Sequence, residues 1–201
     1  LEHDLKLNLA ISMGASGFIL IDDSYFKRYS NYYKRMESKG ETNIELNVPA
    51  KQFLNIIVGD KIGDILKKEN NGIYQKQIRL SYKNTTNTFT SNNVIAMIKG
   101  SEFPDEYIII SAHLDHIGKH DGKIFNGADD DGSGTIAILE IAEAFKEAEI
   151  DGYGPKRSIV FLHVTAEEKG LLGSKYYTDF NPIVPLKNTL ANLNIDMIGR
   201  I

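Results

Sequence analysis

Three aspartates stand side by side in the segment NGADDDGSG, residues 126–134, with glycines on both sides. Carboxylates held this close repel one another, so a simple polar turn gives no reason to place three together. A bound cation would remove the repulsion. The simpler alternative is that the acids cap a following helix, although one aspartate would be enough for that. The segment therefore predicts a turn that binds a metal ion.

Other possible ligands come directly after apolar runs that read as buried strands. In a parallel α/β sheet, ligands bind beyond the carboxyl ends of the strands, so these residues are expected at one edge. Each has an ordinary alternative: a histidine at a strand end can be a plain polar residue, and a Glu-Glu pair can be helix-start charge. The residues are His113 and Asp115 after the run at 107–112, Glu167 and Glu168 after 157–166, and Asp196 after 190–195.

The types of these residues limit which metal they could hold. The chain has no cysteine, so the ligands are nitrogen and oxygen only. Such sites suit zinc, manganese, cobalt or magnesium, and histidine favours zinc. The carboxylates outnumber what one tetrahedral zinc needs, which favours two ions sharing a carboxylate. Such a pair can polarise a carbonyl, generate hydroxide near neutral pH and stabilise a tetrahedral intermediate, with an unligated glutamate as general base.

The elements that position these residues alternate between strands and helices. The clearest helix is expected over 132–148, where Ile138, Ile141, Ala142 and Phe145 form an apolar stripe. This alternation predicts an α/β fold with a largely parallel central sheet. Other elements are expected as helices near 5–15, 60–69 and 170–180, buried strands at 17–22, 107–112 and 157–166, strands at 53–58, 92–100 and 190–195, an exposed strand at 74–89, and a solvated polar stretch at 24–43.

Composition narrows the class of protein. The 201 residues carry a net charge of −4, which argues against nucleic acid as the main partner, and no apolar run has the length of a membrane span. The Asn70–Gly72 turn suggests a domain boundary, with one domain at 1–72 and a second at 73–201. The chain starts at Leu1 without a signal peptide and stops just after a strand, so we expect a piece of a longer protein.

Four ordered motifs resemble the co-catalytic zinc exopeptidases of the bacterial leucyl aminopeptidase and glutamate carboxypeptidase type. They are SAHLDH, NGADDDGSG, VTAEEKGLLGS and NIDMIG, between residues 93 and 201. The resemblance implies a three-layer α/β/α zinc-peptidase domain with a mixed, largely parallel sheet. Residues 1–72 more loosely resemble part of a protease-associated (PA) domain, of α+β type.

The resemblance also implies a role for each site residue. Two zinc ions are expected, and a cis peptide bond is expected after the bridging aspartate. The implied catalytic residues are Glu167 as general base and Asp115 as the carboxylate that orients the histidine ligand. The implied metal ligands are His113 and Asp196 for the first zinc, Asp130 as the bridge and Glu168 for the second zinc.

One ligand of the family pattern is missing. The second zinc of the family takes a histidine from well downstream, and the chain stops before that position. His116 and His120 do not match it; His116 is expected near the site rather than as a ligand. His163, inside a buried strand, is expected to be a core residue. The fragment alone is therefore expected to bind metal poorly and to turn over little.

The function that the residues and the resemblance together predict is peptide hydrolysis by an aminopeptidase. A non-catalytic receptor or scaffold relative, a carboxypeptidase and a glutaminyl-cyclase-like enzyme remain alternatives on the same fold. A two-metal phosphoesterase would fit the metal chemistry, but the chain shows no phosphate-binding glycine loop or basic cluster. The resemblance to this family implies that the protein is exported to the periplasm or the extracellular space. The sequence indicates neither residue specificity nor oligomeric state.

Overall fold

The computed structural model describes residues 2–39, 42–47, 53–67, 72, 79–81 and 85–200. They form two compact units that divide between Asn87 and Thr88, later in the chain than the boundary at 72 that the sequence suggests. Part of the exposed strand expected at 74–89 lies outside the described residues, and 79–81 and 85–89 are not in a strand. None of the helices in the described ranges is long and apolar enough to cross a membrane.

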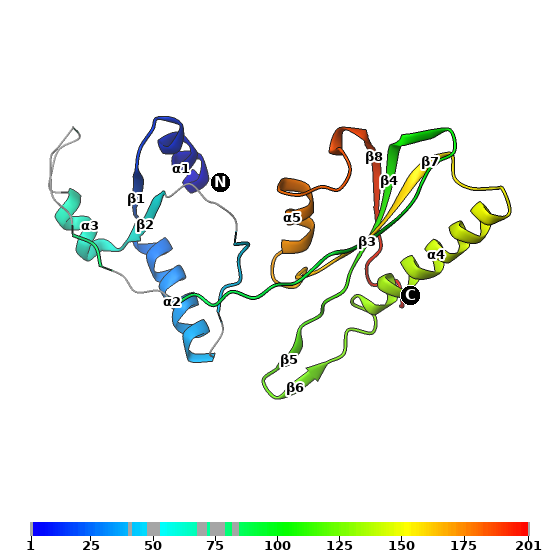
Figure 1. Cartoon of the computed structure of the whole chain (residues 1–201). Helices are drawn as coiled ribbons and strands as arrows, with labels where there is room; N and C mark the ends of the chain where they lie inside the picture. Colours follow the sequence, from blue (N-terminus) through cyan, green and yellow to red (C-terminus); the bar gives the residue numbers. More distant parts are fainter. Residues whose placement is uncertain are drawn as a thin grey trace. The chain divides into compact units, whose positions relative to one another are not determined.

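The first unit contains a βαβ arrangement with two further helices (Figure 1). Strands β1 (Gly17–Ile21) and β2 (Leu54–Val58) pair in parallel. Helix α2 (Asp23–Lys39) lies between them in the chain, with α1 (Glu2–Ser12) before and α3 (Asp60–Lys67) after. The strands and the two outer helices match the predicted elements. Nothing in this unit tests its resemblance to a PA domain.

The solvated polar stretch predicted at 24–43 forms helix α2 over most of its length. Its side chains are mostly exposed, as predicted, but the sequence did not predict the helix. The carboxylate of Asp22 accepts a hydrogen bond from the backbone N–H of Tyr25 at 2.9 Å and so caps the helix start. Along the helix, Phe26, Tyr29, Tyr33 and Met36 recur at intervals of three or four residues, which is the spacing of one helix face. The abundance of charged residues between them hid this periodicity.

The second unit is built on a four-stranded mixed sheet with the order β3-β7-β4-β8. Strand β4 pairs in parallel with β7 and β8, and only β3 is antiparallel to its neighbour. The elements are β3 (Val94–Ile98), β4 (Phe103–His113), the hairpin β5 (Gly118–His120) and β6 (Lys123–Phe125), α4 (Gly132–Ile150), β7 (Arg157–Val164), α5 (Leu172–Asp179), a 3₁₀ turn (Leu186–Asn188) and β8 (Thr189–Asn194).

Helices cover both faces of this sheet (Figure 1). Side chains alternate between the faces of a strand, so Ile159 and Phe161 of β7 point to one side while Val160 and Leu162 point to the other. Ile138 of α4 packs in the first cluster, and Tyr177 of α5 packs in the second. Full burial of one such aliphatic side chain stabilises the fold by about 1.5–3 kcal/mol. The predicted three-layer α/β/α fold is therefore confirmed.

Tyr177 brings a polar atom into this core. Its ring is 3% exposed, and its hydroxyl is buried without a hydrogen-bond partner among the described residues; burial also raises the pKa of the phenol. We expect Tyr177→Phe to raise the free energy of unfolding by about 1 kcal/mol, because it removes an unsatisfied buried group and keeps the ring. Urea unfolding measures the change.

The matched control for that substitution is Tyr176→Phe. Tyr176 is the preceding residue of α5, and its ring is exposed. Its replacement should change the unfolding free energy by less than about 0.5 kcal/mol. A loss of stability in Tyr177→Phe would mean that the buried hydroxyl has a bonding partner in solution, and the expectation would be wrong.

Candidate metal centre

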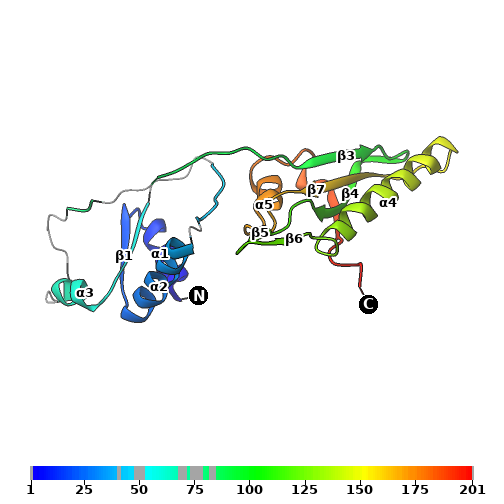
Figure 2. The same cartoon turned by 90° about the horizontal axis from the view of Figure 1, so that it is seen from below.

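The carboxyl ends of the three parallel strands and the start of α4 meet at one edge of the second unit. This edge is at the lower end of the sheet in Figure 1, and Figure 2 looks at the molecule from that side. The structure brings all six predicted site residues to it. His113 ends β4 and is followed by Asp115, Asp130 precedes α4, Glu167 and Glu168 follow β7, and Asp196 follows β8.

His113, Asp130 and Asp196 form the first group that could hold a metal ion. The Nε2 atom of His113 lies 3.0 Å from Oδ1 of Asp130 and 3.9 Å from Oδ1 of Asp196. The same nitrogen is 3.9 Å from Oε2 of Glu167, which belongs to neither group of possible ligands. The imidazole is only 4% exposed, so its unbonded nitrogen faces the carboxylates and not solvent.

His116, Asp130 and Glu168 form the second group. The Nδ1 atom of His116 is 2.8 Å from Oε1 of Glu168 and 3.9 Å from Oδ2 of Asp130. The two oxygens of Asp130 therefore face different groups, Oδ1 toward His113 and Oδ2 toward His116. This is the geometry that a carboxylate shared between two ions requires.

The hydrogen bonding at these atoms fits the binding of a cation. His113 Nε2, His116 Nδ1 and Glu168 Oε1 are all buried and form no hydrogen bond with any residue that the structure describes. Buried polar atoms without partners are rare and call for an explanation such as a bound ion. Two ligands on a tetrahedral zinc lie about 3.3 Å apart, and the separations of 2.8 to 3.9 Å here bracket that value. The residues therefore fit a metal that prefers nitrogen and oxygen ligands.

Asp115 was expected to orient the imidazole of His113 through its carboxylate, and the structure differs. The Nδ1 atom of His113 lies 2.8 Å from the backbone carbonyl of Asp115, whereas the carboxylate is 3.9 Å away. That carboxylate instead accepts hydrogen bonds from the backbone N–H groups of Glu167, at 2.9 Å, and Glu168, at 3.3 Å. Asp115 thus orients the imidazole through its main chain and holds the Glu167–Glu168 turn through its side chain.

The neighbours of Asp130 shape the turn that presents it. Asp131 is buried, and its two oxygens accept hydrogen bonds at 3.0 Å from the N–H groups of His113 and of Gly134 in the first turn of α4. Asp129 accepts a hydrogen bond at 2.9 Å from the N–H of Gly199. The Asp130–Asp131 peptide bond is cis, as the resemblance predicted. Asp131 therefore caps the helix, while Asp130 faces both groups of possible ligands.

The crowded acids shift one another's protonation. Burial raises the pKa of Glu167, and the charges of Glu168, Asp196 and Asp115 add to the effect against the opposing influence of His113. Burial likewise raises the pKa of Asp196, with Asp131 as the largest charge contribution. Burial alone would lower the pKa of His113, but its hydrogen bond to Asp115 and the surrounding carboxylates outweigh it, so that pKa is raised. Neighbouring carboxylates contribute to all three shifts in the same direction, and a bound cation would oppose that contribution.

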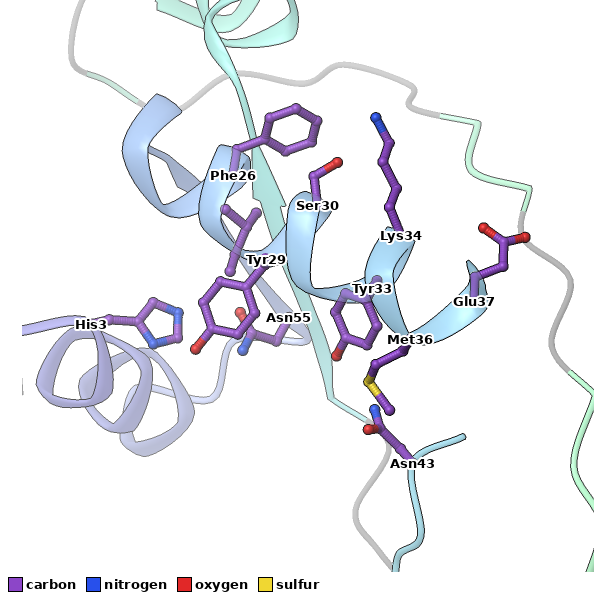
Figure 3. A pocket seen from close by; sticks show the side chains of 11 residues that line it. His3, Phe26, Tyr29, Ser30, Tyr33, Lys34, Met36, Glu37, Asn43 and Asn55 are labelled. Atoms are coloured by element: carbon purple, nitrogen blue, oxygen red, sulfur yellow. The ribbon is translucent and has the colours of Figure 1, made fainter. Parts of the chain in front are cut away.

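Other candidate positions lie apart from these two groups. His163 is buried in β7 with Nε2 3.1 Å from the carbonyl oxygen of Thr135, which confirms it as a core residue. His120 is in the β5–β6 hairpin, 3.5 Å from Asp121. In the first unit, a pocket lies beside α2 and is lined by side chains that include His3, Tyr29 and Asn55 (Figure 3). Its described residues form no group of three possible metal ligands.

His116 is the site residue that the sequence analysis did not assign as a ligand. It stands three positions after His113, but its approach to Glu168 depends on how two loops fold against each other, and no periodicity encodes that. The available signal was a second histidine within the motif SAHLDH, directly after the residue expected to orient the first.

The fold and the site together define an α/β protein whose strand-end loops form a candidate metal centre of histidine and carboxylates. The model of Peptidase family M28 matches residues 93–201, more than half of the chain. The chain belongs to this family.

Curated relatives of the chain are named either as glutamate carboxypeptidases or as aminopeptidases. The "Probable glutamate carboxypeptidase LAMP1" of Arabidopsis thaliana is 34% identical over 73% of this chain and 20% of its own length. "Aminopeptidase YwaD" of Bacillus subtilis is 35% identical over 70% of this chain and 30% of its own length. The chain thus spans less than a third of either relative. The solved structure of a zinc aminopeptidase from Bacillus subtilis aligns with 94% of this chain and 40% of its own, at 24% identity and a TM-score of 0.46.

Proposed function

We propose that the whole protein is a zinc-dependent exopeptidase that removes N-terminal residues from peptides. The observation that carries the proposal is the convergence of two histidines and two further carboxylates around Asp130, with buried nitrogen and oxygen atoms that have no hydrogen-bond partner among the described residues. Membership of Peptidase family M28 supports a peptide as the substrate. Relatives named as aminopeptidases support the type of reaction.

In this proposal His113, Asp130 and Asp196 would hold one zinc ion, and Asp130 and Glu168 would contribute to a second. Bound zinc would supply Lewis-acid polarisation of the scissile carbonyl and would lower the pKa of a water molecule. The carbonyl of Asp115 keeps the imidazole of His113 oriented, because it bonds to the nitrogen on the far side of the ring from the ligand atom.

Glu167 is the general base in this proposal. Its carboxylate borders the first group without belonging to either, so it is free to accept a proton from the attacking water and pass it to the leaving amine. The raised pKa of Glu167 brings it closer to neutrality, where proton transfer in both directions is more efficient. The backbone N–H of Glu167 donates a hydrogen bond to the carboxylate of Asp115, and this bond fixes the backbone from which the Glu167 side chain extends.

The charge of the site favours an aminopeptidase over a carboxypeptidase. The carboxylate of Glu167 is partly exposed and belongs to neither group of possible ligands, so a bound ion would not take up its charge. It would attract the free ammonium of a substrate's N-terminus. A carboxypeptidase needs a cation for the terminal carboxylate of its substrate. At this edge of the sheet, the described ion pair that involves a basic residue is between Arg200 and Asp129, at 3.8 Å. The guanidinium of Arg200 faces solvent and not the cluster of possible ligands.

Two substrates separate these activities. The longest natural form of the protein that contains these residues is supplied with zinc and given an aminoacyl-nitroanilide, and in parallel an N-acylated dipeptide that ends in glutamate. We expect hydrolysis of the first alone, loss of activity with a chelator, and recovery with zinc. Hydrolysis of the acylated dipeptide alone would establish a carboxypeptidase, and hydrolysis of neither would contradict the exopeptidase proposal for these substrates.

Two further proposals rest on the resemblance alone. We propose that the first unit is part of a PA domain and that the protein is exported. Fractionation of the source cells, with an antibody against the second unit, tests export: recovery in the cytosol would contradict it.

A further inference from the structure

Asp196 is a proposed ligand that the packing of the fold does not hold in place. Its side chain is 41% exposed. Immediately before it, the N–H of Ile195 bonds to the carbonyl oxygen of Ser111 in β4 at 2.8 Å. Met197 and Ile198, the two residues after it, have exposed side chains. The position of the Asp196 carboxylate therefore depends on how the backbone after it is held.

Two side chains at the start of α4 hold this backbone. The carboxylate of Asp129 accepts a hydrogen bond from the N–H of Gly199 at 2.9 Å. The hydroxyl of Ser133 accepts one from the N–H of Ile198 at 3.1 Å and donates one to the carbonyl oxygen of Asp129 at 2.7 Å. Figure 1 shows the end of the chain beside the start of α4. We call these four residues the clasp.

The clasp joins the two segments that contribute oxygen ligands to the same proposed ion. Asp130 directly follows Asp129, and Asp196 lies just before the amides that the clasp bonds. We propose that Asp129 and Ser133 are positioning residues that fix Asp196 beside Asp130 and His113 and so set the affinity of that ion. This inference rests on the proposed function, because it concerns the same metal centre. Neither positioning residue belongs to a group of possible ligands.

The backbone next to Asp196 needs such a restraint. Met197 has a φ of +53°, a left-handed conformation that is unfavourable for a residue with a side chain. Such a conformation persists only where the surrounding structure holds it. Met197 lies between Asp196 and the bonded amide of Ile198. Release of that amide would let the backbone relax and move the carboxylate of Asp196 away from the ion.

Gly199 permits the close approach on which the clasp depends. A Cβ at this position would lie 2.8 Å from Oδ1 of Asp129 and 3.3 Å from Cβ of Ser133, so it would push the carboxylate away from the amide. The other oxygen of Asp129, Oδ2, is 3.8 Å from Nε of Arg200. The side chain of Arg200 is exposed, and an ion pair in solvent contributes little. The hydrogen bond to Gly199 is therefore the contact that holds the segment.

The test compares variants that remove the clasp with one that keeps it. Isothermal titration of the longest natural form that contains these residues gives the number and affinity of bound zinc ions. We expect Asp129→Ala and Ser133→Ala each to weaken one ion by about 10–100-fold, as loss of a residue that supports a ligand does, and to leave any other ion unchanged. Asp129→Asn keeps the acceptor oxygen without the charge and should bind zinc as the wild type does.

A second measurement needs no metal. Hydrogen exchange of the metal-free proteins should be faster at the amides of Ile198 and Gly199 in the two alanine variants, and unchanged there in Asp129→Asn. Ser101→Ala is the matched control for loss of a serine hydroxyl. This hydroxyl also bonds to a backbone carbonyl, that of Pro155 at 3.2 Å, but Ser101 precedes β4 at the opposite edge of the sheet. Its replacement should alter neither zinc affinity nor exchange at those amides. Thermal unfolding confirms that each variant is folded.

The possible outcomes separate this inference from the exopeptidase proposal. Unchanged zinc affinity in both alanine variants overturns the positioning role and leaves the exopeptidase proposal standing. An equal loss of affinity in Asp129→Asn and Asp129→Ala means that the charge of Asp129 attracts the ion, and this also overturns the inference. Zinc binding that depends on the clasp, in a protein that hydrolyses neither test substrate, supports the inference and contradicts the exopeptidase proposal. If the wild type binds no zinc, both fail.

Discussion

Replacing Glu167 with glutamine is expected to lower kcat by about 10²–10⁴-fold and to leave zinc binding unchanged. Glutamine has nearly the same shape and keeps the backbone N–H that bonds to Asp115, but its amide cannot accept a proton from water. Glu167 belongs to neither group of possible ligands, so the ions should remain. The measurement is kcat and KM on an aminoacyl-nitroanilide, beside zinc titration of the same protein, in the longest natural form that contains these residues.

A glutamate on the same unit provides the control for this substitution. Glu140 is exposed on α4, and Glu140→Gln should keep the wild-type kcat. If Glu167→Gln loses one zinc ion together with activity, the residue is a ligand and not the base. If it keeps full activity, proton transfer runs through another group, and the role proposed for Glu167 is wrong.

The central fold was predictable because buried parallel strands leave a clear mark in the sequence. Strands such as β7 are covered on both faces, so they appear as continuous apolar runs. The helix α4 showed an apolar stripe of helical period. Polar residues at the ends of such runs must then gather at one edge, and for that reason His113, Asp130, Glu168 and Asp196 could be grouped before the structure was known.

The elements that were missed carry weaker or conflicting local signals. The β5–β6 hairpin has three residues in each strand, too few for a periodicity. Its one signal was the dipeptide Asp121–Gly122, where both residues have positive φ, as a tight hairpin turn requires. Helix α2 is mostly exposed, as predicted, but the many charged residues between its aromatic side chains hid the helical period.

The contacts between loops could not be predicted from the sequence. Asp115 contacts His113 through its carbonyl and the Glu167–Glu168 backbone through its carboxylate. This division depends on the distance between two strand ends. The meeting of His116 with Glu168 is of the same kind. The side chains involved were identifiable by type and position, but which atom of each faces which partner is fixed only by the folded loops.

Replacing Asp130 with alanine is expected to abolish high-affinity binding of both zinc ions, because this carboxylate faces both groups of possible ligands. Each group would keep only two protein ligands, and we expect the affinity for each ion to fall by at least 100-fold. Thermal unfolding gives a second measurement. At free zinc 100 times its dissociation constant, the wild type should gain about 2.7 kcal/mol for each independent ion, and the variant should gain about 0.4 kcal/mol or less.

The same substitution should act in the opposite direction without metal. The charge of Asp130 contributes to the raised pKa of Asp196, so its removal relieves repulsion among the carboxylates. At a pH above the pKa of His113 the imidazole is neutral, so the substitution removes no attraction between Asp130 and an imidazolium. Under these conditions metal-free Asp130→Ala should unfold at the same temperature as the wild type or higher. The control is Asp129→Asn, which removes an adjacent negative charge outside both groups and should retain both ions. If Asp130→Ala keeps one ion at unchanged affinity, the two groups do not share this residue. A cluster that is unfavourable when empty and favourable when filled would explain why three aspartates stand side by side.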